Sequence, residues 1–207
     1  MFVLKELQEK NIIQYGEFKL KSGKLSNVYI DLRKVISFPS LHKQICHEII
    51  NKINPDVDLI CGTPYGAVSY SSYISIFHNI PMIFLRKEAK NHGTKKMIEG
   101  NYEFNNRVVL IEDVTTTGSS VFNAIDVLEQ HGLKVVQIIT IISRHVNKQL
   151  YYNDKPIEYL YHIDDIEDEK RFNEKSLQTI ISEKNTKICL AADVYNMNDL
   201  CDLIEKV

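Results

Sequence analysis

The segment Lys134–Ile142 (KVVQIITII) is almost continuously apolar and rich in β-branched residues. A strand with this pattern is usually covered on both faces, as in a parallel sheet flanked by helices. Shorter apolar runs precede it at Val57–Cys61, Pro81–Leu85 and Arg107–Ile111, and longer amphipathic stretches separate them. The alternation predicts βαβ units and therefore an α/β fold with a mainly parallel central sheet.

Amphipathic stretches at Leu41–Ile53, Ala67–His78 and Ser119–His131 are predicted to be the flanking helices, and Gly132 stands where a C-cap is expected. Residues 1–35 do not follow this alternation of strands and helices. Their sequence predicts a short helix followed by hairpin-like pieces. We therefore expect a single domain over residues 1–207, with an N-terminal subdomain at about 1–35, an α/β core at about 36–165 and a C-terminal extension.

Composition excludes several classes of protein. The formal net charge of −2 argues against a general nucleic-acid-binding surface. The four cysteines, Cys46, Cys61, Cys189 and Cys201, have no C-x-x-C spacing, which is typical of reduced thiols rather than a zinc or redox site. The N-terminus lacks the apolar region of a secretion signal, and no uncharged apolar run is long enough to span a membrane. We expect a cytoplasmic protein without nucleic-acid or membrane partners.

The segment Val108–Ser120 (VVLIEDVTTTGSS) carries the sharpest chemical signal. An apolar strand ends in the adjacent carboxylates Glu112 and Asp113, and the Thr/Gly/Ser loop 115–119 leads into a helix. Ligands of open α/β sheets bind at such strand ends, and loop amides at a helix N-terminus bind phosphate. The carboxylates can accept hydrogen bonds from ribose hydroxyls beside that phosphate. An ordinary βα turn with an N-cap is the alternative interpretation.

The segment Arg86–Gly100 (RKEAKNHGTKKMIEG) concentrates positive charge on a protein that is negative overall. Between Arg86 and Lys96 it holds five basic side chains and one acidic one. Glycine, asparagine and histidine make a regular element improbable there, so we expect an exposed loop. A bound polyanion would relieve the mutual repulsion of its cations. By itself, however, the pattern is equally compatible with a solvated surface loop.

Two further segments have weaker signals. Cys61–Ser69 (CGTPYGAVS) follows a predicted strand and opens a helix, so that its backbone amides can meet an anion. Phe18–Arg33 (FKLKSGKLSNVYIDLR) combines a cation with an aromatic side chain, which suits a flat ring bearing a carboxylate. Taken singly, Lys21 would be interpreted as an exposed turn lysine and Tyr29 as a half-buried strand residue.

Together these segments resemble the type I phosphoribosyltransferases, and R-K-E-A-K-x-H-G in particular resembles the orotate phosphoribosyltransferases, including the corresponding half of UMP synthase. The resemblance covers about Phe18 to Arg144. It implies the type I phosphoribosyltransferase fold with an N-terminal hood. It also implies transfer of the 5-phosphoribosyl group from phosphoribosyl pyrophosphate (PRPP) to orotate, which yields orotidine 5′-monophosphate and pyrophosphate in de novo UMP biosynthesis.

The resemblance also implies roles for individual residues. The PRPP-binding residues are Lys21, Tyr65, Gly66, Arg86, Lys87, Lys90, His92, Glu112, Asp113, Val114, Thr115, Thr116, Thr117, Gly118, Ser119 and Ser120. The orotate-binding residues are Lys21, Tyr29, Ile30, Thr116 and Arg144. Those expected to act in catalysis are Lys87, Lys90, His92 and Asp113.

This chain departs from the family pattern at two positions. Many bacterial members have a lysine where this chain has Gly66, although UMP synthase lacks it as well. Arg144 stands in Ser-Arg-His-Val-Asn-Lys, whereas the family usually has Asp-Arg and a glycine-rich continuation. The alternatives left open are a phosphoribosyltransferase for another base, a PRPP-sensing regulator without catalysis, and an inactive paralogue.

The resemblance further implies Mg²⁺ as a cofactor, held mainly by PRPP and water rather than by protein ligands. It implies a homodimer in which the Arg86–Gly100 loop reaches the neighbouring subunit's site. An orotidylate decarboxylase barrel needs roughly 200 further residues, so we expect any such activity to reside in a separate partner protein. The acidic run at 164–169 is interpreted as a solvated surface segment.

Overall fold

A computed structural model describes residues 2–19, 23, 25–87 and 97–166 of the chain. Three predicted site residues, Lys21, Lys90 and His92, lie outside the described residues, as do Cys189, Cys201 and residues 167–169 of the acidic run. The helices and strands of the central region are α2 (Pro39–Ile50), β3 (Leu59–Gly62), α3 (Val68–His78), β4 (Met82–Leu85), β5 (Ile98–Glu99), β6 (Arg107–Thr115), α4 (Ser119–Gln130), β7 (Lys134–Ser143), β8 (Leu150–Tyr152) and β9 (Lys155–His162).

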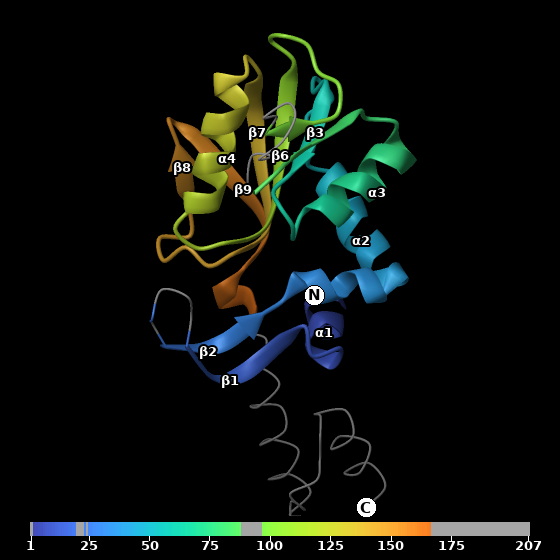
Figure 1. Cartoon of the computed structure of the whole chain (residues 1–207). Helices are drawn as coiled ribbons and strands as arrows, with labels where there is room; N and C mark the ends of the chain where they lie inside the picture. Colours follow the sequence, from blue (N-terminus) through green and yellow to red (C-terminus); the bar gives the residue numbers. More distant parts are fainter. Residues whose placement is uncertain (1, 20–22, 24, 88–96, 167–207) are drawn as a thin grey trace, which may run out of the picture. The chain divides into compact units, whose positions relative to one another are not determined.

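The central sheet has seven strands in the order β5-β4-β3-β6-β7-β9-β8 (Figure 1). Strands β4, β3, β6, β7 and β9 pair in parallel, and the antiparallel strands β5 and β8 form its two edges. This arrangement confirms the predicted α/β fold with a mainly parallel sheet. Strands β6 and β7, at the centre, are buried over most of their length, as their apolar sequences predict.

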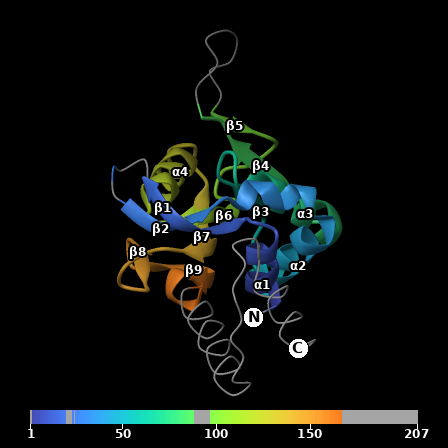
Figure 2. The ribbon, with the colours of Figure 1, turned by 90° about the horizontal axis from the view of Figure 1, so that it is seen from below.

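Helices cover both faces of the sheet, with α4 on one side and α2 and α3 on the other (Figure 2). Helix α4 buries Val121, Ala124, Ile125 and Leu128, whose spacing places them on one stripe. These side chains join the core cluster that contains the strand residue Leu110. The packing on both faces explains why the central strands have no polar face.

The N-terminal region forms helix α1 (Phe2–Glu9) and the antiparallel strands β1 (Ile13–Lys19) and β2 (Leu25–Ile30), which make a separate two-stranded sheet. This hood lies at the end of the central sheet from which the β6–α4 loop emerges (Figure 1). The short helix η1 (Leu32–Ser37) follows it. The Tyr70 hydroxyl of α3 donates a 2.9 Å hydrogen bond to the carbonyl of Leu32 and so links the hood to the core.

The observed elements differ from the prediction mainly after Arg144. The polar sequence there predicted no strand, yet Leu150–Tyr152 and Lys155–His162 form a hairpin whose second strand pairs in parallel with β7. Strand β6 also continues to Thr115 rather than ending at Ile111. In both cases pairing with β7 outweighs local polarity.

Residues 163–207 form a second compact unit, of which the structure describes a helical turn at 163–166. None of the helices in the described part of the chain is both long and apolar enough to cross a membrane.

Candidate active site

Glu112, near the end of β6, is turned into the protein and is only 4% exposed. Its Oε1 accepts a 2.6 Å hydrogen bond from the Thr63 hydroxyl, and its Oε2 accepts a 2.5 Å bond from the Ser120 hydroxyl. Burial raises the pKa of Glu112 to about 7, and a hydrogen bond with Asp113 adds to this effect. Glu112 therefore ties the turn after β3 to the first turn of α4.

Asp113 is half-buried and lies against the turn that follows β3. Its Oδ1 accepts a 2.8 Å hydrogen bond from the Val114 amide. A Cβ atom added to Gly66 would lie 1.8 Å from Asp113 Oδ2, which is far inside van der Waals contact. A side chain at position 66, such as the lysine of many bacterial members, would therefore displace this carboxylate.

The loop between β6 and α4 has the backbone form expected of a phosphate cradle. Gly118 has a φ of +84°, a left-handed conformation that glycine adopts without penalty, and it precedes the first residue of α4. Thr116, Thr117 and Ser119 are exposed, and the hydroxyls of Thr117 and Ser119 lie 2.9 Å apart. The loop thus presents hydroxyl groups beside the amides of a helix N-terminus, where an anion is stabilised.

The two described cations of the basic loop are already engaged with neighbours. The Arg86 guanidinium forms a 2.8 Å ion pair with Glu99 of β5. The Lys87 ammonium lies 4.4 Å from the centre of the Tyr65 ring, in a cation–π contact. Lys87 and Tyr65, both predicted to bind PRPP, therefore meet although they belong to different loops.

The hood contributes the residues predicted to surround the base. The rings of Tyr29 and Phe18 lie 5.4 Å apart, and Ile30 is half-buried beside Tyr29. Arg144, just after β7, donates a 2.7 Å hydrogen bond from Nη2 to the Ser26 hydroxyl of β2. The unusual sequence around Arg144 does not prevent its side chain from reaching the hood.

Sequence reasoning missed several residues of this site. Thr63, Ser26 and Glu99 hold predicted site residues in place through contacts with residues distant in the sequence. Arg33 forms an ion pair with Asp31, and a hydrogen bond to the same carboxylate raises the pKa of Arg33. All four lie in segments with a recognisable motif, but the segments alone do not indicate which side chains meet.

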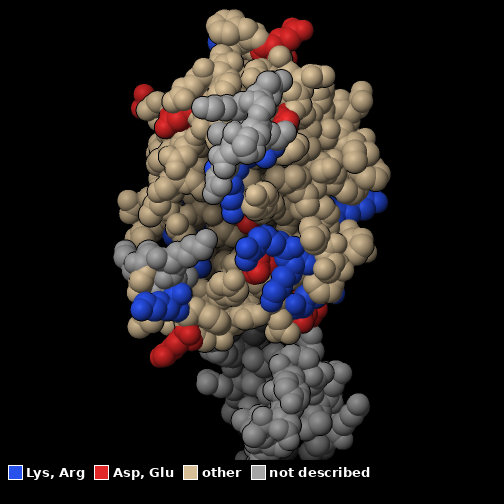
Figure 3. All heavy atoms as spheres, viewed as in Figure 1, with Lys and Arg blue, Asp and Glu red and all other residues tan. Residues whose placement is uncertain are grey.

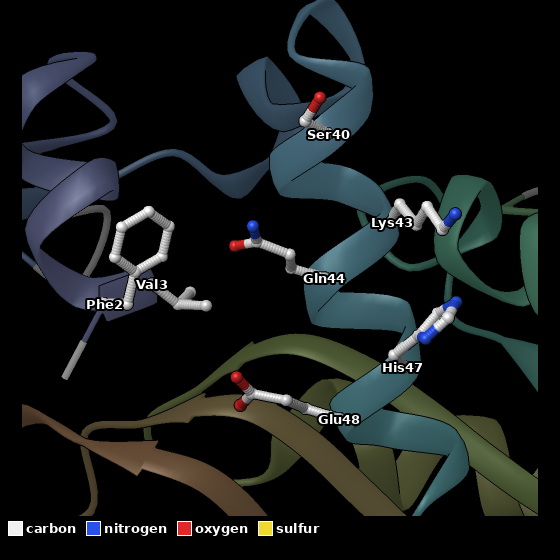
Figure 4. Close-up of a pocket in the computed structure, with 7 residues that line it drawn as sticks. All are labelled: Phe2, Val3, Ser40, Lys43, Gln44, His47 and Glu48. Carbon is white, nitrogen blue, oxygen red and sulfur yellow. The ribbon is translucent and has the colours of Figure 1, made fainter.

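Basic and acidic side chains gather around a hollow on the face shown in Figure 3. A pocket of about 690 Å³ lies elsewhere, between α1 and α2, and is lined by Phe2, Val3, Ser40, Lys43, Gln44, His47 and Glu48. Figure 4 shows Phe2 and Val3 of α1 facing Gln44 and Glu48 of α2 across it. None of the predicted site residues that the structure describes lines this pocket.

Comparisons with known proteins agree with the geometry. Residues 40–184 match the model of the phosphoribosyl transferase domain family. The orotate phosphoribosyltransferase of Methanosphaera stadtmanae is 39% identical over 154 residues, which cover 74% of this chain and 86% of the relative. The uridine 5′-monophosphate synthase of Bos taurus is 39% identical over 141 residues, 67% of this chain and 29% of the relative.

Among solved structures, the orotate phosphoribosyltransferase of Aeropyrum pernix superimposes with a TM-score of 0.73 at 24% identity, over 82% of this chain and 98% of that one. This similarity confirms the type I phosphoribosyltransferase fold. The family match and the sequence relatives show that the chain belongs to the phosphoribosyltransferases and, within them, to the orotate phosphoribosyltransferase family.

Proposed function

We propose that this chain transfers the 5-phosphoribosyl group from PRPP to orotate, with orotidine 5′-monophosphate and pyrophosphate as products, in UMP biosynthesis. One observation carries the proposal. The carboxylate of Asp113 lies against the turn at Gly66, directly beside the cradle that precedes α4. A ribose 5-phosphate joined to pyrophosphate requires such an arrangement of carboxylate, cradle and turn.

The cradle at residues 115–119 is proposed to bind the 5-phosphate, because exposed hydroxyls and helix amides converge there. Asp113 accepts hydrogen bonds from the ribose hydroxyls. Glu112 is proposed to have a different role from Asp113. In the free protein, both of its carboxylate oxygens already accept hydrogen bonds from the hydroxyls of Thr63 and Ser120. Glu112 aligns the turn and the cradle on either side of the ribose.

In the proposed reaction, the bond from C1 of the ribose to the pyrophosphate oxygen breaks, and positive charge develops on the sugar. The negative charge of Asp113 stabilises that cation, and the loop cations Lys87, Lys90 and His92 stabilise the departing pyrophosphate. N1 of orotate then attacks C1 from the opposite face, with inversion. No covalent bond to the protein is required.

Orotate is proposed to lie against the Tyr29 ring, with Ile30 and Thr116 beside it and its carboxylate at Arg144. A guanidinium matches a carboxylate with two parallel hydrogen bonds, which makes this contact selective for a base that carries one. Lys21 is assigned to the same substrates by the family resemblance alone.

We propose Mg²⁺ as the cofactor, bound through PRPP and water. The residues present fit such an ion, because the half-buried Asp113 carboxylate beside the turn can accept hydrogen bonds from the ribose hydroxyls and waters that would coordinate it. When bound, Mg²⁺ neutralises charge on the pyrophosphate.

We propose that the protein is a homodimer in which the Arg86–Gly100 loop serves the neighbouring site. Helix α3 supports this proposal, because it exposes Ile76 and Phe77 at 74% and 66%, with Tyr73 stacked on Phe77 at 4.3 Å. Apolar side chains clustered at a surface are typical of an interface. A second copy of the chain is the proposed occupant of this surface, in keeping with the loop sharing that the family resemblance implies.

We also propose a separate orotidylate decarboxylase as a partner. The chain matches only 29% of the uridine 5′-monophosphate synthase of Bos taurus, so that the rest of that relative has no counterpart in the matched region. A cytoplasmic location is likewise proposed. Two buried cysteines, Cys46 and Cys61, support it, because they are free thiols rather than partners in a disulfide. Burial raises the pKa of each thiol to about 12, which keeps it protonated and unreactive.

The test is to mix the purified protein with orotate, PRPP and Mg²⁺ and to follow the loss of orotate absorbance. Uracil, hypoxanthine and adenine serve as parallel substrates. Turnover of orotate alone, abolished by Lys90→Ala and by Asp113→Asn, is the expected result. Turnover of a different base, or of none, would contradict the proposal.

A further inference from the structure

The hydrogen bond between Arg144 and Ser26 joins residues that are 118 positions apart. Ser26 belongs to strand β2 of the hood, whereas Arg144 follows β7 of the central sheet. Nη2 of Arg144 lies 2.7 Å from the Ser26 hydroxyl oxygen, which is the short distance typical of a charge-assisted hydrogen bond. The hood and the core therefore meet directly at the predicted base-binding arginine.

The Ser26 hydroxyl is held in a fixed orientation. It donates its single proton to the carbonyl of Val28 at 2.7 Å, and the Val28 amide lies 3.2 Å from the same oxygen. Because a hydroxyl has one proton and two lone pairs, this arrangement directs a lone pair towards the guanidinium. Ser26 is thus a preorganised acceptor rather than a rotating surface hydroxyl.

The backbone of Arg144 is held as firmly as its side chain. Its amide donates a 2.7 Å hydrogen bond to the carbonyl of Thr115, at the start of the phosphate cradle. The carbonyl of the next residue, His145, lies 2.9 Å from the imidazole of the buried His162 in β9. The backbone bond at one end and the bond to Ser26 at the other together restrict the direction of the guanidinium.

The strand that carries Ser26 also carries Tyr29, the aromatic residue of the predicted base site. Ser26 pairs with Phe18 across the hood, and the Phe18 ring contacts Tyr29, three residues further along β2. A bidentate contact with a carboxylate depends on the direction of the guanidinium plane as well as on distance. A guanidinium held in one orientation by Ser26 therefore favours a base whose carboxylate lies in a matching plane.

We propose that Ser26 is a positioning residue that orients Arg144 towards the carboxylate of the base, and that it thereby contributes to the preference for orotate. This inference rests on the proposed function of the site. Ser26 acts on base recognition through Arg144, so its loss is expected to weaken orotate binding without impairing PRPP binding or the chemical step.

The experiment compares Ser26→Ala, Ser26→Thr and Arg144→Ala with the wild type. Ser26→Ala should raise the KM for orotate about 10-fold, the range expected for loss of a hydrogen bond to a charged group. Its kcat and its KM for PRPP should stay within about two-fold, and Ser26→Thr, which retains the hydroxyl, should recover most of the loss. Calorimetric titration with orotate in the presence of pyrophosphate and Mg²⁺ gives a second readout that needs no turnover.

Gln14→Ala is the matched control, since it removes a hood hydrogen bond, from Gln14 Nε2 to the carbonyl of Asn11, that does not involve Arg144. It should leave the KM for orotate unchanged. The double variant Ser26→Ala/Arg144→Ala should bind orotate no more weakly than Arg144→Ala alone, because the serine acts only through the arginine.

Normal orotate affinity in Ser26→Ala, additive losses in the double variant, or an equal rise in both KM values would each overturn the inference. If the wild type binds no orotate, the proposed function itself fails and the inference fails with it. If the wild type and Arg144→Ala differ as expected but Ser26→Ala does not, the function stands and only the role of Ser26 is refuted.

Discussion

The carboxylate of Asp113 occupies the space that a side chain at the position of Gly66 would fill. A Cβ atom on Gly66 would lie 1.8 Å from Asp113 Oδ2 and 2.2 Å from its Cγ. A side chain at position 66 would therefore displace the Asp113 carboxylate from its present position. This close approach brings the proposed pyrophosphate turn next to the proposed ribose-binding carboxylate.

We predict that Gly66→Ala displaces Asp113 and raises the KM for PRPP at least 10-fold, while it lowers the free energy of unfolding by about 1–3 kcal/mol through overpacking. Steady-state kinetics and chemical denaturation measure the two effects. Because the clash is with Asp113, the same substitution should cost less stability in an Asp113→Ala background. An equal cost in both backgrounds would show that the contact does not matter.

The pKa of Glu112 predicts a specific dependence of stability on pH. In the folded protein it is about 7, above its ordinary value of 4.5, mainly because of burial. The folded state therefore keeps a proton that the unfolded chain has released. The stabilisation from Glu112 is complete below about pH 4.5 and is lost as the pH rises through about 7.

A Glu112→Gln variant cannot titrate at this position. As the pH rises, the wild type should therefore lose free energy of unfolding relative to the variant. We expect the difference to change by on the order of 2–3 kcal/mol between pH 4.5 and 8. Urea denaturation across this range is the measurement. The exposed Glu103→Gln serves as the control and should show no such trend, and a flat difference for Glu112→Gln would contradict the prediction.

The ion pair between Arg86 and Glu99 predicts an indirect role for Glu99 in PRPP binding. Their side chains are each about one-third exposed, and the pair fixes the guanidinium at the start of the basic loop. Glu99→Ala should raise the KM for PRPP roughly 3- to 10-fold and leave the KM for orotate nearly unchanged. Glu103→Ala, which removes an exposed carboxylate four residues further along the chain, should have no effect. A lower KM for PRPP in Glu99→Ala would mean that the pair restrains Arg86 instead of positioning it.

The exposed side of α3 predicts the effect of a single charge on assembly. Phe77→Asp should convert a dimer into a monomer in multi-angle light scattering, because an unpaired carboxylate is costly in an apolar interface. Activity should fall with it, since each site lacks its partner's loop. Phe104→Asp changes another exposed phenylalanine, outside α3, and should leave the dimer intact. A dimeric Phe77→Asp variant would place the interface elsewhere.

Much of the core follows from local sequence pattern. The apolar stretches at Lys134–Ile142 and Arg107–Ile111 correspond to β7 and β6, and the glycine predicted as a C-cap follows α4. Continuous apolarity with many β-branched residues indicates a strand covered on both faces, because such residues favour extended backbone and each face then packs against a helix layer. The acid pair and the Thr/Gly/Ser loop were recognisable for a similar reason, since a strand end and a helix start adjoin within one segment.

The strand β9 shows where such pattern reading fails. Its sequence, KPIEYLYH, carries polar groups that locally favour a surface segment, and only pairing with β7 makes it a strand of the sheet. In the same way, two adjacent acids in one motif suggested two similar ribose contacts. Whether each faces the ligand or the interior depends on Thr63 and Ser120, which approach Glu112 from other elements.

The sequence by itself determined the α/β alternation, the family and the chemical character of each segment, because these depend on neighbours within a few residues. Only the tertiary structure decided which side chains meet. The contacts of Gly66 with Asp113, Lys87 with Tyr65 and Ser26 with Arg144 join separate loops. Such contacts depend on how the strands of the sheet and the hood pack against each other. The spacing of residues along the chain does not indicate that packing.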